Sequence, residues 1–309
     1  MTLETIETAR RRLERYLRPT PLVFSEALKV WLKLETQQPT GSFKVRPALN
    51  NVLEHLEEAQ RCGVLASSSG NFAQAVAYAA RELGLSASIV MMSSSSPYKI
   101  AQTKALGAEV VLCGNTFEER WETTYRLQKE TGRVLLHPYD SPETIAGDGT
   151  LGLELLEQLP EPFTVAAPVS GGGLISGIAT AVKLGRPGCS VVGVQPEANA
   201  SLSKSLEAGK RVNVGPVRTI ADALVASSPG ERTFEIIRER VDRVVLVTEE
   251  EIAMAVRELA WKQKIIAEPG GAAAVAALLA GKLRDDHKNL VCVISGGNVA
   301  AETFRELTA

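Results

Sequence analysis

Short apolar runs alternate with longer segments of helical periodicity along almost the whole sequence. The apolar runs, each of strand length, lie at 30–35, 63–67, 88–92, 109–113, 133–137, 163–169, 190–196, 243–248 and 290–295. The helical patterns lie between them, at 42–60, 71–83, 97–106, 116–131 and 174–184. Strands that alternate with helices at this spacing run parallel and carry helices on both faces of the sheet. The sequence therefore predicts an α/β fold built on open parallel sheets.

The organisation into domains follows from the length and from the absence of a linker. The chain has 309 residues, which suits one large domain or two smaller ones that share a core. No Pro-rich or Gly-rich linker and no repeat divides it, so a second domain would have to be an insertion that the chain leaves and re-enters. We expect a small inserted domain at 48–139 and a large domain formed by 1–47 and 140–309.

Composition and charge exclude several classes of function. The net charge is −2 and aromatic residues make up 5%, so nucleic-acid binding is not expected. The longest apolar run, 272–280, is too short to cross a membrane, and the N-terminal segment lacks the apolar core of a secretory signal. The four cysteines stand far apart without a Cys-x-x-Cys pair, which predicts reduced thiols in a cytoplasmic protein.

Lys44 stands in the motif T-G-S-F-K-V-R at 40–46, which follows a strand and opens a helix. In the first turn, the positive end of the helix dipole, partial burial and the nearby Arg46 would all lower the lysine pKa. A neutral amine is the form that attacks an aldehyde, so the placement favours Schiff-base chemistry. The alternative is an ordinary solvated lysine on a helix surface.

A run of three glycines lies between a strand and a helix. It consists of Ser170, Gly171, Gly172, Gly173 and Leu174. Glycines allow backbone N–H groups to converge on one point, and the helix start adds a positive dipole, which together form a phosphate cradle. The spacing is neither a P-loop nor Gly-x-Gly-x-x-Gly. The alternative is a tight turn that binds nothing.

Two further loops follow strands. The segment S-S-S-G-N-F-A-Q at 67–74 offers hydroxyls and free N–H groups for a carboxylate, and the amide of Asn71 could reach a phenolic oxygen. Simple helix capping by Ser69 or Asn71 is the alternative. Ser295, in V-I-S-G-G-N, offers a neutral hydroxyl at the end of another strand. Ligands of parallel sheets bind beyond the carboxyl ends of strands, so we expect all four motifs to form one site.

Together these motifs resemble the fold-type-II pyridoxal-phosphate family, which includes threonine dehydratases and serine racemase. The resemblance covers nearly the whole chain and adds R-P-T-P-L at 18–22, I-A-G-D-G-T at 145–150, T-I-A-D at 219–222, E-P at 268–269 and S-G-G-N at 295–298. It implies a fold like that of the tryptophan synthase β-subunit, with two open α/β domains, the smaller inserted in the larger. It also implies a homodimer or tetramer.

The resemblance assigns a role to each motif. Lys44, beside Phe43, would hold pyridoxal 5′-phosphate as a Schiff base, and residues 170–174 would bind its phosphate. Asn71 would face the cofactor O3′ and Ser295 the pyridine nitrogen, where a serine weakens the ring as an electron sink and suits β-elimination over transamination. The substrate would be a 3-hydroxy amino acid, such as L-threonine or L-serine, that leaves as a 2-oxo acid and ammonia.

The substrate loop of this resemblance comprises Ser68, Ser69, Gly70, Asn71 and Phe72. Racemases of the family carry a serine at Ser69 that acts on the face opposite the lysine. Racemisation needs acid–base groups on both faces, so an amino-acid racemase that uses Lys44 and Ser69 is the alternative function.

Several positions depart from the family pattern. Phe72 replaces a usual histidine, Pro47 a glycine and Asp148 a glutamine. Racemase-type members bind Mg²⁺ or Mn²⁺ through a Glu and an Asp at the positions of Gln195 and Ser201, and neutral ligands bind such ions poorly, so no metal is expected.

Other activities stay open at this point. A synthase of the same fold usually carries Ser-Gly-Asn-Thr-Gly, which this chain lacks, and a non-catalytic nucleotide-binding module would need the glycine loop but not Lys44. The chain ends soon after Ser295, so a C-terminal regulatory domain is not expected. The sequence does not rank serine, threonine, 3-hydroxyaspartate or a bulkier 3-hydroxy amino acid.

Overall fold

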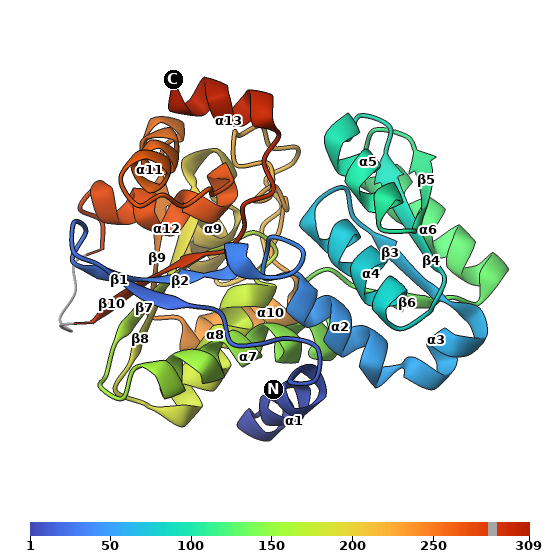
Figure 1. The fold of residues 1–309 in the computed structure, drawn as a ribbon, viewed down its shortest axis with the longest axis horizontal. Helices are drawn as coiled ribbons and strands as arrows, with labels where there is room; N and C mark the ends of the chain where they lie inside the picture. Colours follow the sequence, from blue (N-terminus) through green and yellow to red (C-terminus); the bar gives the residue numbers. More distant parts are fainter. Residues whose placement is uncertain (284–288) are drawn as a thin grey trace.

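A computed structural model describes residues 1–283 and 289–309 and contains two sheets. The larger sheet has six strands in the order β1-β2-β10-β7-β8-β9, and the smaller has four in the order β5-β4-β3-β6. Their bounds are β1 Leu22–Ser25, β2 Val30–Leu34, β3 Val64–Ser67, β4 Ala87–Met92, β5 Glu109–Cys113, β6 Val134–Leu136, β7 Thr164–Pro168, β8 Ser190–Pro196, β9 Arg243–Val247 and β10 Leu290–Ile294. The two sheets occupy separate halves of the molecule (Figure 1). The predicted α/β class is confirmed.

The helices connect and cover these strands. They are α1 Leu3–Leu13, α2 Val45–Glu54, α3 Leu56–Cys62, α4 Asn71–Glu82, α5 Pro97–Ala105, α6 Phe117–Thr131, α7 Pro142–Gln158, α8 Gly173–Gly185, α9 Ser201–Ala208, α10 Glu231–Arg240, α11 Glu249–Trp261, α12 Pro269–Leu279 and α13 Ala301–Thr308, with short 3-10 turns at Glu35–Gln37 and Glu197–Asn199. Within the described ranges, no helix has the length and apolarity needed to cross a membrane.

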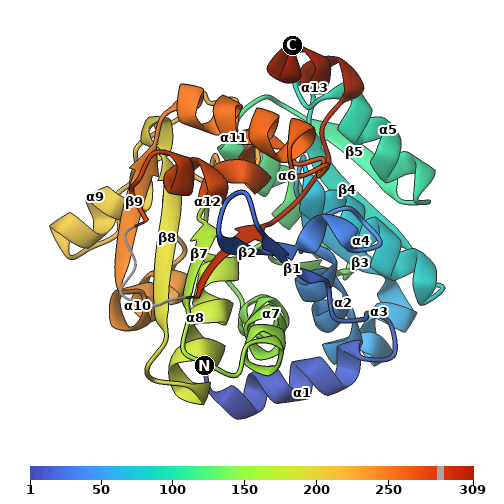
Figure 2. The same cartoon turned by 60° about the vertical axis from the view of Figure 1, so that its left-hand side comes forward.

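The inner strands β10, β7 and β8 of the six-stranded sheet are buried on both faces. Along β10, Val291 and Val293 pack toward α7 and α8, whereas Cys292 and Ile294 pack toward α11 and α12. Figure 2 shows these two helix pairs on opposite sides of the strands. This alternation explains why its parallel strands read as continuous apolar runs. One strand departs from the expected parallel arrangement, because β1 pairs antiparallel with β2 at the edge.

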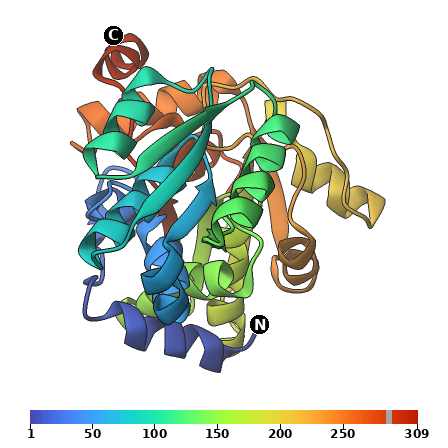
Figure 3. The same cartoon turned by 90° about the vertical axis from the view of Figure 1, so that its right-hand side faces the viewer.

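All four strands of the smaller sheet run parallel, and the chain enters it after β2 and leaves it before β7. Helix α6 lies on one face, and α4 and α5 lie on the other (Figure 3). The smaller sheet is therefore an insertion between two strands of the larger one.

The helices differ from the prediction at several places, and α9 to α13 lie in segments for which no helix was predicted. The segment 42–60 was expected to be one helix, but α2 begins at Val45 and the chain breaks at His55 before α3. Helix α7 was not expected, because its glycines have low helix propensity. A Cβ on Gly149 would lie 2.7 Å from the Ile6 side chain, so close packing of α1 on α7 explains a glycine at this position.

Candidate active site

A cavity of about 310 Å³ lies at the carboxyl ends of strands from both sheets. The residues that the sequence analysis assigned to cofactor and substrate binding all line this cavity: Phe43, Lys44, Ser68, Ser69, Gly70, Asn71, Phe72, Ser170, Gly171, Gly172, Gly173, Leu174 and Ser295. Four motifs that are far apart in the chain therefore meet in one place. The volume is at the small end of the range for pockets that hold small molecules and cofactors.

Lys44 immediately precedes the first residue of α2, and its amine lies at the cavity wall. Its Nζ donates a 2.7 Å hydrogen bond to the carbonyl oxygen of Pro138. The rings of Phe43 and Phe72 have their centroids 4.8 and 5.6 Å from Nζ. Burial lowers the pKa of Lys44, and the nearby Asp148 only partly opposes this effect. The site therefore favours the neutral, nucleophilic amine.

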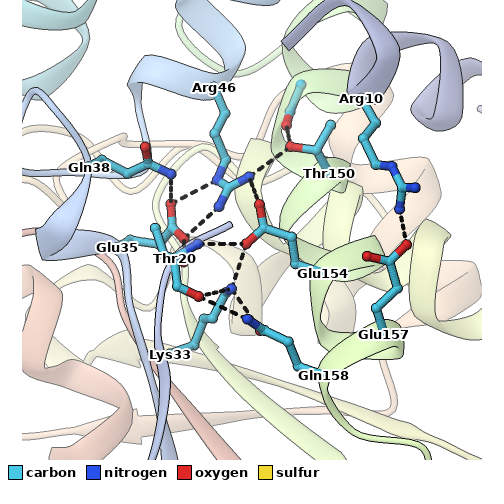
Figure 4. Close-up of polar contacts among 11 residues, drawn as sticks. Arg10, Thr20, Lys33, Glu35, Gln38, Arg46, Thr150, Glu154, Glu157 and Gln158 are labelled. Atoms are coloured by element: carbon cyan, nitrogen blue, oxygen red, sulfur yellow. Dashed lines mark hydrogen bonds and ion pairs between the residues drawn. The ribbon is translucent and has the colours of Figure 1, made fainter. Parts of the chain in front are cut away.

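Arg46 does not act on Lys44 as expected. Its side chain enters a buried ion network, where Nε and Nη2 donate to Glu35 at 2.8 and 2.9 Å and Nη1 donates to Glu154 at 2.6 Å (Figure 4). Lys33 donates to the same Glu154 at 2.5 Å, so two cations balance two carboxylates. The expectation that Arg46 helps to lower the lysine pKa is wrong, because its charge is neutralised in this network.

The ion network also explains two sequence motifs that line no part of the cavity. Thr20, from R-P-T-P-L, donates to Glu35 at 2.6 Å, and Thr150, from I-A-G-D-G-T, accepts from Arg46 at 3.1 Å (Figure 4). Thr150 thus binds Arg46 directly, and Thr20 binds Glu35, which is the partner of Arg46. They fix the start of α2, and with it the position of the lysine.

The glycine loop makes a close turn into α8. Gly172 has φ +98°, a left-handed conformation that side chains strain, and α8 begins at Gly173. A Cβ on Gly171 would lie 2.4 Å from the ring of Tyr139. The first N–H groups of a helix have no intrahelical acceptor, so this loop presents free donors to the cavity. Such donors suit a phosphate.

Asn71, Glu268 and Ser295 lie at another part of the wall. Asn71 Nδ2 donates to Glu268 Oε1 at 2.5 Å, while its Oδ1 accepts from Asn298 at 2.9 Å. Glu268 Oε2 has no partner among the described residues, and burial raises the pKa of Glu268 to about 7. Asn71 and Ser295 both line the cavity.

Asp148 is fully buried, and neither carboxyl oxygen has a partner among the described residues. Burial raises the pKa of Asp148 to about 7, and Lys44 opposes the rise. A Cβ on Gly173 would lie 2.8 Å from its Oδ2. This departure from the family pattern therefore places a readily protonated carboxyl directly behind the glycine loop.

Ser69 contacts a residue that the sequence analysis missed. Its Oγ accepts from the Met92 N–H at 3.2 Å and from Arg120 Nη1 at 3.4 Å. Arg120 and Tyr139 also line the cavity. Neither belongs to a motif, and the helical pattern around Arg120 does not reveal which face looks into a site.

The described residues fit a phosphorylated aldehyde. The cavity offers an amine of lowered pKa, a cradle of backbone donors and unpartnered polar atoms on one wall. In the described ranges, no cluster of three or more His, Cys, Asp or Glu could hold a metal ion. Gln195 and Ser201 hydrogen-bond to each other at 3.5 Å instead.

Comparisons with known proteins agree with this chemistry. A family model described as pyridoxal-phosphate dependent enzyme matches residues 13–296. The L-threonine ammonia-lyase of Thermotoga maritima is 44% identical over 305 residues, which cover 97% of this chain and 76% of that protein.

Two solved structures extend the comparison. The threonine deaminase of T.th. has a TM-score of 0.92 and 45% identity, covering 97% of this chain and 99% of that one. Maize serine racemase has a TM-score of 0.94 and 34% identity, covering 99% and 96%. The cofactor that the sequence predicted is the one that names the matching family, and the chain belongs to the family of pyridoxal-phosphate dependent enzymes.

Proposed function

We propose that this protein is an ammonia-lyase that dehydrates and deaminates a 3-hydroxy amino acid, of the class of L-threonine and L-serine, to a 2-oxo acid and ammonia. The observation that carries the proposal is the position of Lys44, whose amine has a lowered pKa and lines the same cavity as the glycine loop. Relatives named L-threonine ammonia-lyase and threonine deaminase, at 44% and 45% identity over 97% of the chain, support it.

Pyridoxal phosphate, when bound, supplies an aldehyde that condenses with amines and a ring that withdraws electrons from the substrate Cα. The protein supplies the acid–base groups and the geometry. Lys44 Nζ is the base for the Cα proton, because burial favours its neutral form. The N–H groups of Ser69 to Asn71 at the start of α4 hold the substrate carboxylate.

Aromatic rings form the walls around Lys44. The rings of Phe43 and Phe72 flank its Nζ, and Tyr139 closes the cavity beside Gly171. An apolar surround strengthens electrostatic interactions and protects reactive species from hydrolysis. Ser295, which lines the cavity, would offer a neutral hydroxyl to the ring nitrogen of the cofactor, and such a partner would favour elimination over transamination.

Amino-acid racemisation is the second candidate function, and the contacts of Ser69 favour it. Ser69 Oγ accepts two N–H groups, so its own hydrogen is free to be donated and an alkoxide there would be stabilised. The 34% identity to maize serine racemase supports this candidate. Lys44 and Ser69 would then serve opposite faces of the substrate Cα.

The proposal includes the organisation of the chain and its assembly. The small domain is residues 48–139, which contain the whole four-stranded sheet, and the large domain is 1–47 with 140–309. A homodimer or tetramer is supported by the exposed side chains of Met254, Trp261 and Ile266, on or just after α11. All four cysteines are free, which supports a cytoplasmic location.

A substrate screen tests the proposal. Purified holoenzyme is incubated with 3-hydroxy amino acids, and 2-oxo acid and ammonia are measured together. Equal release of both products from at least one substrate is expected, and a Lys44→Ala variant should release neither. A protein that retains its cofactor but yields no 2-oxo acid from any of them would contradict the proposal.

A further inference from the structure

Arg120 is a buried cation without an anionic partner. The residue is 6% exposed, its Nε has no hydrogen-bond partner among the described residues, and burial lowers its pKa. Its closest contacts are the Ser69 hydroxyl and the face of the Phe117 ring, whose centroid lies 4.6 Å from the guanidinium carbon. Burying an unpaired charge costs free energy, so an anionic ligand that binds this guanidinium would offset that cost.

Lys99, another cationic residue of the cavity wall, already has an anionic partner. Lys99 also lines the cavity, but its Nζ donates to Asp222 at 2.6 Å. The groups whose charges act on Arg120 are Cys113 and Tyr139, both uncharged at neutral pH, and no described carboxylate is among them. Arg120 is therefore a cavity cation without an anionic partner among residues 1–283 and 289–309.

A second unpartnered donor lies on the same stretch of wall. The Ser95 hydroxyl is buried without a partner among the described residues, and residues 94–96 line the cavity. Ser95 follows Met92, whose N–H donates to the same Ser69 oxygen that Arg120 contacts. The Arg120 guanidinium and the Ser69 hydroxyl, which it contacts at 3.4 Å, match the two oxygens of a carboxylate.

The anionic groups that every substrate complex contains have other binding partners. The cofactor phosphate has the backbone donors of the glycine loop, and the substrate α-carboxylate has those at the start of α4. The contact that Arg120 makes with the loop before α4 is to the side chain of Ser69 and not to these backbone donors. A carboxylate on the substrate side chain is then the anion left for the Arg120 guanidinium, which lines the same cavity.

We propose that Arg120, with Ser69, binds a carboxylate on the substrate side chain, so that the preferred substrates are dicarboxylic 3-hydroxy amino acids such as 3-hydroxyaspartate. This inference rests on the proposed elimination activity and narrows its substrate class. The Cα–H and Cβ–OH bonds break, a Cα=Cβ bond forms and water leaves. The enamine tautomerises to an imine, takes up water and releases ammonia, which leaves a 2-oxo dicarboxylic acid.

The test compares Arg120→Gln with the matched variant Arg126→Gln. Arg126 lies on the same helix, is exposed and pairs with Glu130 at 3.0 Å. We expect the ratio of kcat/KM for L-threo-3-hydroxyaspartate over L-threonine to fall about 100-fold in Arg120→Gln, since a charged hydrogen bond is lost, and to stay as in the parent in Arg126→Gln. Arg120→Lys keeps the positive charge but lacks the planar guanidinium, so it should retain part of the preference for 3-hydroxyaspartate.

A binding measurement that needs no turnover accompanies the kinetics. L-Aspartate and L-asparagine have the same shape and differ in side-chain charge, and their dissociation constants are measured by thermal shift with the holoenzyme. The parent should bind L-aspartate at least about 10-fold more tightly, and Arg120→Gln should lose this preference. Circular dichroism and the dissociation constant of pyridoxal phosphate check that each variant is folded and loaded.

Three results would overturn the inference. An equal loss on both substrates would assign Arg120 to the α-carboxylate, a weakened cofactor affinity would assign it to the phosphate, and an unchanged ratio would give it no ligand. Failure of the proposed function is distinct, because the parent would then release no 2-oxo acid from either substrate. The L-aspartate and L-asparagine comparison still decides the role of Arg120 in that case.

Discussion

The Nζ of Lys44 donates a 2.7 Å hydrogen bond to the backbone carbonyl of Pro138. Lys44 follows β2 of the larger sheet, whereas Pro138 lies two residues after β6 of the smaller one. His137 holds this segment, because its Nδ1 accepts the Asp140 N–H at 2.8 Å. Burial lowers the pKa of His137 to about 4, so the imidazole stays a neutral acceptor at neutral pH. The amine is thus positioned by both sheets.

Gly172→Ala should weaken the binding of pyridoxal phosphate before it unfolds the protein. Gly172 has φ +98°, and a Cβ there would lie 2.8 Å from Ile237 and 2.9 Å from Thr233, so the loop must shift. Cofactor titration of the apoprotein measures the affinity. Gly84→Ala is the control, since Gly84 also has a positive φ, +67°, but an added Cβ would meet nothing within 4 Å. Equal affinities in both variants would mean that the glycine loop is only a turn.

Asp148→Asn should flatten the pH dependence of stability. The pKa of Asp148 is raised to about 7 in the folded state, from about 3.9 in unfolded chains. The protonated carboxyl therefore stabilises the fold fully below pH ~4, and this contribution is lost as the pH rises to about 7. Asparagine stays neutral, so the variant should match the parent near pH 4 and exceed it by roughly 2–4 kcal/mol at pH 8.

Urea unfolding of the apoprotein across this pH range measures the difference. Glu268→Gln is the comparison variant, because the pKa of Glu268 is also raised to about 7. Each single variant should retain the pH slope of the other carboxyl, and the double variant should have the flattest profile. If the free energy of unfolding depends on pH in the same way in the parent and in Asp148→Asn, ionisation of Asp148 does not destabilise the fold and this prediction is wrong.

Glu35→Gln should destabilise the protein by about 3–5 kcal/mol, because it leaves the buried Arg46 charge only partly paired. The free energy of unfolding in urea measures the loss. Glu157→Gln is the control, since Glu157 pairs with Arg10 at the surface, where such a pair is worth at most about 1 kcal/mol (Figure 4). Equal losses of unfolding free energy in the two variants would show that the buried ion network does not fix the start of α2.

Ser69→Ala should separate racemisation from elimination. Returning a proton to the face opposite Lys44 needs a donor, and the loss of a general acid–base group typically lowers a rate ~10²–10⁴-fold. Elimination draws on Lys44 and should fall much less. Chiral chromatography of serine, run beside a 2-oxo acid assay, gives both rates. A variant that racemises as fast as its parent would exclude Ser69, and a parent that forms no D-serine would leave this serine a ligand only.

Much of the fold was predictable because parallel strands that are buried on both faces read as apolar runs, as β8 does. The four loops that line the cavity were predictable too, since glycines and hydroxyls gather where a strand ends and a helix begins. Strand β1 escaped because it has four residues and Val23 and Phe24 are exposed. Helix α7 escaped because its glycines, which let α1 and α8 pack closely, lower helix propensity.

The contacts inside the site could not be read from the sequence. Arg46 lies two residues after Lys44, but the sequence gives no sign that Glu35 and Glu154 turn its charge away from the amine. Arg120 on α6 contacts Ser69, which follows β3, although the two residues are 51 positions apart in the chain. Such pairs depend on how helices pack, which local periodicity does not specify.

Trapping of the cofactor tests the central claim most directly. The holoenzyme is reduced with borohydride, digested, and searched by mass spectrometry for a lysine that carries a pyridoxyl group. We predict the adduct on Lys44 alone, together with loss of the visible absorption band in Lys44→Ala while the circular dichroism spectrum is kept. An adduct on another lysine, or a Lys44→Ala variant that keeps the band, would contradict it.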